Sequence, residues 1–189
     1  MEVLGSIFSA FGLSASAGLN AYIPLLVISL LGRFTNLIEL KAPWDTLESP
    51  WIIGLLVGLT LIEFFADKFP AINHVNDAIQ TFVRPVAGAI LFAASARVIT
   101  DVHPVISLAA GLLVAGGVHA VKSLAIRPAV TATTGGVGNV PVSILEDIIS
   151  GVVSFFSIVI PVLFAMFVII IASWVVWKIW YRPGARKPA

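Results

Sequence analysis

The sequence predicts an all-α fold, a polytopic bundle of helices embedded in a lipid bilayer. Of its 189 residues, 59% are hydrophobic and only 11% are charged, whereas charged residues make up about a quarter of an ordinary soluble domain. Five stretches are long and apolar enough to cross a hydrocarbon core, which takes about 20 residues of helix. We therefore predict a single integral membrane domain over residues 1–189, with about five membrane-spanning helices.

The five predicted spans follow one another with short connections. They cover residues 3–31, 50–66, 83–99, 104–123 and 144–181. The longest connection, from Arg33 to Pro50, has fewer than 20 residues and is too short for a separate globular domain. The last span exceeds what one crossing needs, so we expect it to tilt, to kink near Pro161 or to begin inside the protein. Two crossings joined near Pro161 are the less favoured alternative, because no polar turn interrupts the sequence there.

The end of the chain predicts the orientation in the membrane. Three tryptophans and Tyr181 form an aromatic belt, and a basic tail follows at 182–189. The positive-inside rule places such a tail in the cytoplasm. Tracing five crossings backward from the tail puts the N-terminus outside, together with the connection between the fourth and fifth spans.

That connection contains a polar, glycine-rich stretch, Thr131–Ser143, with the sequence TATTGGVGNVPVS. Irregular backbone beside lipid is unfavourable, since each unpaired N–H or C=O in hydrocarbon costs roughly several kcal/mol. The stretch is therefore a surface loop, a re-entrant segment buried in protein, or the lining of a wet cavity. Its small residues resemble an anion nest at a helix N-terminus, whereas Glu146 and Asp147 in the next turn favour a cation or a proton.

An interruption is also predicted in the first span. Pro24 has no N–H to donate to the carbonyl group four residues earlier, so a continuous helix would leave the Asn20 carbonyl unpaired. This would place a carbonyl and an amide side chain together near the middle of the membrane. Discontinuous helices of this kind bind ions and substrates in transporters.

Ionisable residues within the spans form the remaining candidates, because a charge at the bilayer centre costs at least about 2.5 kcal/mol and normally faces a partner or a cavity. Helical spacing places Glu63 and Asp67 on one face of the second span. His119 and Lys122 end a groove of small residues on the fourth. The predicted ion or substrate ligands are Asn20, Glu63, Asp67, Arg84, His119, Lys122, Arg127, Thr134, Gly135, Gly136, Asn139, Glu146 and Asp147.

Each of these patterns also has a purely structural interpretation. The serines that recur along the helices are explained more simply by close helix packing. The carboxylates can be held in ion pairs with Arg84 or Arg127, and His119 is equally well explained as a hydrogen-bonded core histidine. The charge sign of any ligand therefore stays open.

Three motifs resemble a known family. GLNAY at 18–22, RPVAGA at 84–89, and TTGGVGN at 133–139 followed by Pro141, Ser143 and the Glu146-Asp147 pair resemble a bacterial family of small integral membrane proteins designated only as a domain of unknown function. In the family's block Asn is directly followed by Pro, whereas Val140 intervenes here. The resemblance implies a compact helical domain in the bacterial plasma (inner) membrane and supplies no activity.

We predict a small transporter or channel for an ion or small solute, with a polar site formed by interrupted helices. The alternative is a non-catalytic accessory or assembly subunit of a larger membrane complex, such as a respiratory-chain assembly. The predicted partners are the lipid bilayer and either further copies of the chain in a homo-oligomer or a larger membrane complex. A lipid-modifying intramembrane enzyme ranks third, because the sequence contains no HExxH, GxSxG or metal-spaced cluster. No catalytic residue, metal, cofactor or nucleic-acid partner is predicted, and the absence of cysteine excludes thiolate chemistry.

Overall fold

The computed structural model describes residues 2–66, 68, 70–96 and 103–180. The helices, in chain order, are α1 (Glu2–Leu19), α2 (Tyr22–Phe34), η1 (Trp44–Glu48), α3 (Pro50–Ala66), α4 (Pro70–Ala96), α5 (Pro104–Val121), η2 (Lys122–Ile126), α6 (Arg127–Thr134), α7 (Asn139–Val159) and α8 (Pro161–Trp180). None of the described residues forms a β-strand, which confirms the predicted all-α bundle. Two predictions, the site candidate Asp67 and the basic tail at 182–189, lie outside the described residues.

The chain is a membrane protein by the length and apolar character of its helices. Three described segments are long and apolar enough to cross a membrane unaided, namely Asn76–Ala96, Pro104–Thr134 and Asn139–Val159. Shorter apolar helices accompany them in α1, α2, α3 and α8.

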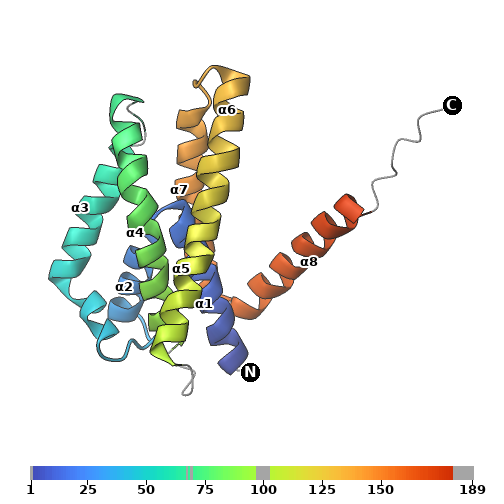
Figure 1. The fold of residues 1–189 in the computed structure, drawn as a ribbon. Coiled ribbons are helices and arrows are strands. Elements are labelled where there is room, and N and C mark those ends of the chain that lie inside the picture. The colour runs from blue at the N-terminus through green and yellow to red at the C-terminus, as the bar shows by residue number, and fades with distance from the viewer. Residues whose placement is uncertain (1, 67, 69, 97–102, 181–189) are drawn as a thin grey trace.

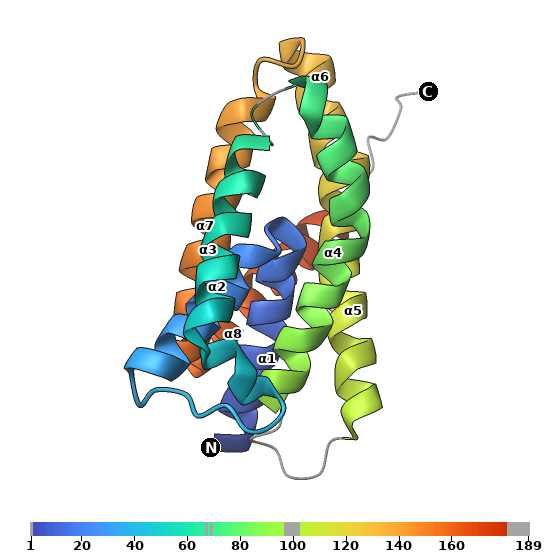
Figure 2. The same ribbon diagram turned by 90° about the vertical axis from the view of Figure 1, so that its left-hand side faces the viewer.

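The predicted first span, 3–31, is two helices rather than one. The chain leaves the helical conformation at Asn20 and reverses, so that α1 rises to the middle of the bundle and α2 leads back from the same point (Figure 2). Asn20 Oδ1 accepts hydrogen bonds from the backbone N–H groups of Tyr22 and Ile23, both at 3.0 Å, and so caps the N-terminus of α2. Pro24 lies in the first turn of α2, where proline is tolerated. The prediction of a single crossing here was wrong, whereas the interruption at Asn20 was correctly located.

The second predicted span coincides with α3, but the third was predicted to begin too late. Helix α4 starts at Pro70 rather than near residue 83. Its first half is amphipathic and buries polar residues, among them Asn76 and Gln80. A search for apolar stretches does not recognise such a segment as part of a membrane span, because its buried face is polar.

The glycine-rich stretch is a turn between two helices at one end of the bundle (Figure 1). Helix α5 continues through the π-helical turn η2 into α6, so that one helical segment extends to Thr134. Gly135 and Gly136 then adopt positive φ angles of 63° and 90°, which end α6 and start the reversal into α7. Most residues of this stretch are exposed or half-buried, which argues against a segment buried in protein, and Thr131, Ala132 and Asn139 line a pocket. The segment that folds back inside the bundle is the α1–α2 hairpin.

The predicted last span, 144–181, also divides in two. Helix α7 ends at Val159, Ile160 has non-helical angles (φ −137°, ψ 60°), and α8 begins at Pro161. Proline interrupts the helix because it has no N–H for the carbonyl group of the preceding turn. Helix α8 turns back toward the α6 end of the molecule and diverges from the bundle (Figure 1). The break lies where a kink near Pro161 was expected, and it divides the predicted span into two helices.

Small residues let α1 pack at the centre of the bundle. Ser16 Oγ lies 2.6 Å from Ser154 Oγ and donates to the Ser150 carbonyl at 2.7 Å, which joins α1 to α7. Gly88 and Gly111 bring α4 and α5 together so closely that a Cβ on Gly111 would lie 2.3 Å from the Gly88 carbonyl oxygen. The serine stripes therefore serve helix packing.

Candidate functional site

The tip of the α1–α2 hairpin meets a group of charged side chains from the surrounding helices. We call this group the charge cluster. It consists of Asn20 at the tip with Glu63, Lys68, Arg84, His119, Lys122, Arg127, Glu146 and Asp147. These residues come from α1–α2, the end of α3, α4, α5, η2, α6 and α7. Most of the predicted ligands are thus brought together.

Asn20 ties the hairpin tip to α7. Its side chain is fully buried. While Oδ1 caps α2, Nδ2 donates to Asp147 Oδ1 at 3.0 Å. Asp147 also lies 3.5 Å from Lys68 Nζ, which itself donates to the Phe64 carbonyl at 2.7 Å and lies 3.3 Å from the centre of the Phe64 ring. The first turn of α2 is therefore held against an ion pair between Lys68, which follows α3, and α7.

The other half of the hairpin tip is held by Lys122. Its Nζ donates to the carbonyl oxygen of Leu19, the last residue of α1, at 2.9 Å and lies 3.0 Å from Glu146 Oε2. The same Oε2 atom accepts from Arg127 Nη2 at 2.7 Å. Lys122 opens the π-helical turn η2, and such turns often occur at functional positions in helices. Glu146 Oε2 thus bridges two cations beside the end of α1.

A third set of contacts surrounds Arg84, whose side chain is fully buried. Arg84 Nη2 donates to Glu63 Oε1 at 2.9 Å, and Nη1 lies 3.1 Å from His119 Nδ1. Because a guanidinium group only donates, Nδ1 must accept, and the imidazole proton of neutral His119 lies on Nε2. That atom faces Thr81 Oγ1 at 3.2 Å.

Sequence reasoning missed several members of this environment. Gln80 forms a hydrogen bond with the Tyr22 side chain. Thr81 orients His119, and Lys68 approaches Asp147. Gln80 and Arg84 lie one turn apart on the same face of α4, so helical spacing would have found Gln80 had α4 been extended toward its N-terminus.

The cluster carries more positive than negative charge. Its defined members include four cationic side chains, Lys68, Arg84, Lys122 and Arg127, against the three carboxylates of Glu63, Glu146 and Asp147. Ion pairs buried in this way are costly to assemble, because the loss of hydration rivals the Coulomb attraction. Hydrophobic side chains would hold the bundle together at least as well.

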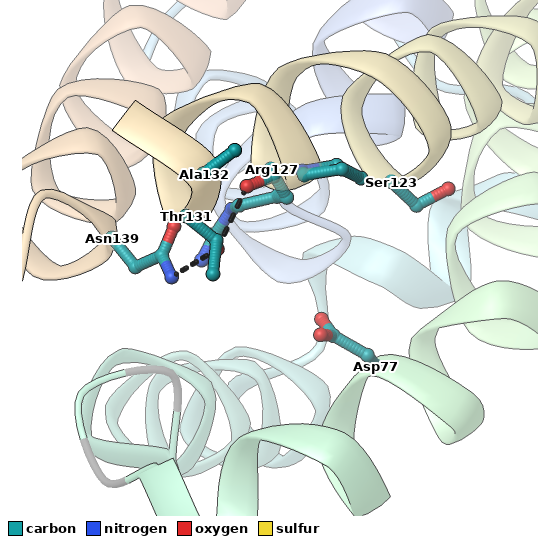
Figure 3. A pocket seen from close by; sticks show the side chains of 7 residues that line it. Asp77, Ser123, Arg127, Thr131, Ala132 and Asn139 are labelled. Carbon is teal, nitrogen blue, oxygen red and sulfur yellow. Dashed lines mark hydrogen bonds between the residues drawn. The ribbon is translucent and has the colours of Figure 1, made fainter. Parts of the chain in front are cut away.

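A pocket of about 420 Å³ lies next to the cluster at the α6 end of the bundle (Figure 3). It is lined by Asp77, Ser123, Arg127, Pro128, Thr131, Ala132 and Asn139. Arg127 belongs to both the pocket and the cluster through its bond to Glu146. Asn139 Nδ2 donates to Thr131 Oγ1 at 2.9 Å, while no described group donates to Asn139 Oδ1. The pocket therefore offers hydroxyl, amide, carboxylate and guanidinium groups.

Three of the predicted ligands join neither the pocket lining nor the cluster. Thr134 Oγ1 accepts from the Gly138 N–H at 3.0 Å and donates to the Val130 carbonyl at 2.7 Å. Gly135 and Gly136 provide the positive φ angles of the turn. These residues shape the α6–α7 connection, and the anion nest expected from them does not form part of the site.

Residues 7–181 match the family model described as Domain of unknown function (DUF4126). The chain belongs to this family. The resemblance inferred from the three sequence motifs is thereby confirmed. No curated protein and no solved structure matches the chain significantly. The DUF4126 match includes the hairpin tip, the charge cluster and the pocket, so all three lie within the family's domain.

Proposed function

We propose that this DUF4126 protein is a small membrane transporter or channel for an ion or small polar solute. The observation that carries the proposal is the helix break at Asn20, because it opens inside the bundle and meets the charge cluster. A break exposes the carbonyl end of one half-helix and the N–H end of the next, and membrane transporters coordinate ions and substrates with such ends.

The energetic cost of the cluster supports the same proposal. Charged residues inside a membrane domain are rare unless they serve a pathway or a binding site. Here they are buried around the hairpin tip rather than distributed over the helices, and serine and glycine contacts already pack α1 against its neighbours. The proposal assigns the cluster to binding and translocation, not to catalysis.

The pocket supplies an entrance in this proposal. Arg127 lines the pocket and binds Glu146, which in turn contacts Lys122 at the end of α1. A polar solute that enters the pocket would therefore meet Arg127 first and reach the hairpin tip by exchanging partners with these paired charges.

We also propose that the protein lies in the bacterial inner membrane with its basic C-terminal tail in the cytoplasm. Because α8 leads back toward the α6 end of the molecule (Figure 1), this orientation puts the pocket nearer the cytoplasmic side. The sequence-based tracing put the same residues in the outer half. The difference comes from the break at Ile160, which adds one reversal of the chain.

Proteoliposomes test the transport proposal. Currents on solid-supported membranes would be recorded for a panel of alkali cations, inorganic anions, amino acids and small carboxylates. We expect at least one solute to give a current with the wild type that is strongly reduced in Asn20→Ala and Asp147→Ala. The matched control is Lys41→Ala, because Lys41 is an exposed cation that is not a member of the charge cluster. Equal currents from the wild type and both cluster variants would contradict the proposal.

The accessory-subunit alternative is favoured by one observation, the course of α8. Its described large apolar side chains, including Phe167, Ile170 and Trp174, are exposed, and the helix diverges from the bundle (Figure 1). Purification from native membranes in a mild detergent tests this alternative. A stoichiometric partner that is lost when Ile170 and Trp174 are replaced by alanine would support it, and a homogeneous homo-oligomer or monomer would contradict it.

A further inference from the structure

Lys122 takes the place that a metal cation would take at a broken membrane helix. Lys122 is 2% exposed, and its ammonium group contacts two oxygen atoms, the Leu19 carbonyl oxygen at 2.9 Å and Glu146 Oε2 at 3.0 Å. The first is the C-terminal end of a half-helix, and the second is a carboxylate. Transporters with discontinuous helices coordinate Na⁺ or H⁺ with the C-terminal ends and unwound carbonyls of those helices.

A buried lysine differs from a metal ion in one respect that matters for function. It can lose its positive charge by releasing a proton, whereas an arginine in the same position stays charged. The neighbouring cations Arg84 and Arg127 therefore keep their positive charge. Lys122, at the end of α1, can lose its charge by deprotonation.

We infer that Lys122 supplies the coupling ion of the proposed transporter: its ammonium group fills a monovalent-cation site formed by the Leu19 carbonyl and Glu146, and its proton exchanges with the aqueous phase. This inference rests on the proposed function and specifies protons, not Na⁺, as the coupling ion. The released proton passes to water on the side to which the site is open, and it returns from water on the other side.

The groups around Lys122 fit such an exchange. Glu146 from α7 attracts the ammonium group, Arg84 from α4 and Arg127 from α6 repel it, and His119 lies one turn earlier on α5. Loss of the Lys122 charge would leave the defined cluster with three cations against three carboxylates. The neutral state is thus balanced in charge, and it lacks the ion pair between Lys122 and Glu146.

Cation rescue provides the first test. Lys122→Ala removes the ammonium group and leaves the Leu19 carbonyl and Glu146 facing a space of roughly its size. We expect the thermal unfolding midpoint of the purified variant to rise saturably when choline chloride is replaced by sodium or methylammonium chloride at constant ionic strength. The rise should be roughly 2–4 °C at a cation concentration a few times the dissociation constant. The wild type, whose site is filled, should show no such rise, and an equal response of both proteins would overturn the inference.

The proton itself is the probe in the second test. A step from neutral to alkaline pH is applied to proteoliposomes on a solid-supported membrane, with no other solute changed. We expect a transient current with the wild type and with Lys41→Ala, and its loss in Lys122→Gln. The glutamine amide can still donate to the Leu19 carbonyl, so this variant retains the contact without the charge and serves if Lys122→Ala does not fold.

The outcomes separate this inference from the transport proposal. A wild-type current of unchanged size in Lys122→Gln would overturn the inference, even if solutes are transported. A proton current that depends on Lys122, in a protein that moves none of the panel solutes, would support the cation site while contradicting transport of those solutes.

Discussion

Asn20 and Asp147 lie 127 positions apart in the chain and are joined by a hydrogen bond of 3.0 Å between Asn20 Nδ2 and Asp147 Oδ1. The same amide group caps α2 through its oxygen atom. One side chain therefore ends a helix, starts the next and binds the helix that packs beside them. This relationship joins the local break in the chain to the charge cluster.

The first prediction concerns this double role of Asn20. Asn20→Ala removes both the cap of α2 and the contact with Asp147, so we expect a loss of about 1–3 kcal/mol in the free energy of unfolding. Thermal unfolding in detergent measures the change. Asn36→Ala is the matched control, because Asn36 is exposed and should change stability by less than about 0.5 kcal/mol. Equal midpoints for the two variants would show that the Asn20 contacts do not stabilise the hairpin.

The second prediction concerns the buried pair of Glu63 and Arg84. Arg84→Met leaves the Glu63 carboxylate without its guanidinium partner, which is expected to cost about 3–5 kcal/mol. Glu63→Gln added to Arg84→Met removes the isolated charge and should restore a large part of the lost stability. A double-mutant cycle of unfolding free energies checks this. Additive effects of the two substitutions would argue that the pair is not coupled.

The third prediction concerns the contact between α4 and α5. Gly111→Ala places a Cβ 2.3 Å from the Gly88 carbonyl oxygen, so we expect a loss of about 1–3 kcal/mol from overpacking. Gly117→Ala on the same helix meets nothing within 4 Å and should stabilise the helix by up to about 1 kcal/mol. The two unfolding midpoints should therefore shift in opposite directions. A shift in the same direction for both would be inconsistent with the close helix approach.

The fourth prediction concerns the pocket as an entrance. Ala132 lines it, whereas Ala129 on the same helix is exposed and is not among the lining residues. Ala132→Trp should fill much of the roughly 420 Å³ pocket and strongly reduce solute current without lowering the unfolding midpoint. Ala129→Trp adds the same side chain to the outside of α6 and should leave the current near the wild-type value. If both variants carry wild-type current, the solute does not enter by this route.

The sequence alone determined the class of the protein and most of the candidate site. An excess of apolar residues over charged ones is a property of composition, and a charge is costly in a bilayer wherever it occurs, so Glu63, Arg84 and Lys122 could be singled out without a structure. Asn20 could be singled out because Pro24 follows it by four residues. The sequence motifs were also sufficient to place the chain in its family.

Only the tertiary structure decided where the chain reverses. Pro24, Pro161 and the glycines after Thr134 each permit a kink, a break or a turn, and the local sequence does not distinguish among these. The choice depends on long-range contacts: the Lys122 bond to the Leu19 carbonyl and the Ser16–Ser154 contact hold α1 inside the bundle and leave α2 to turn back. Such contacts join residues more than 100 positions apart, and neither propensity nor hydropathy measured along the chain contains them.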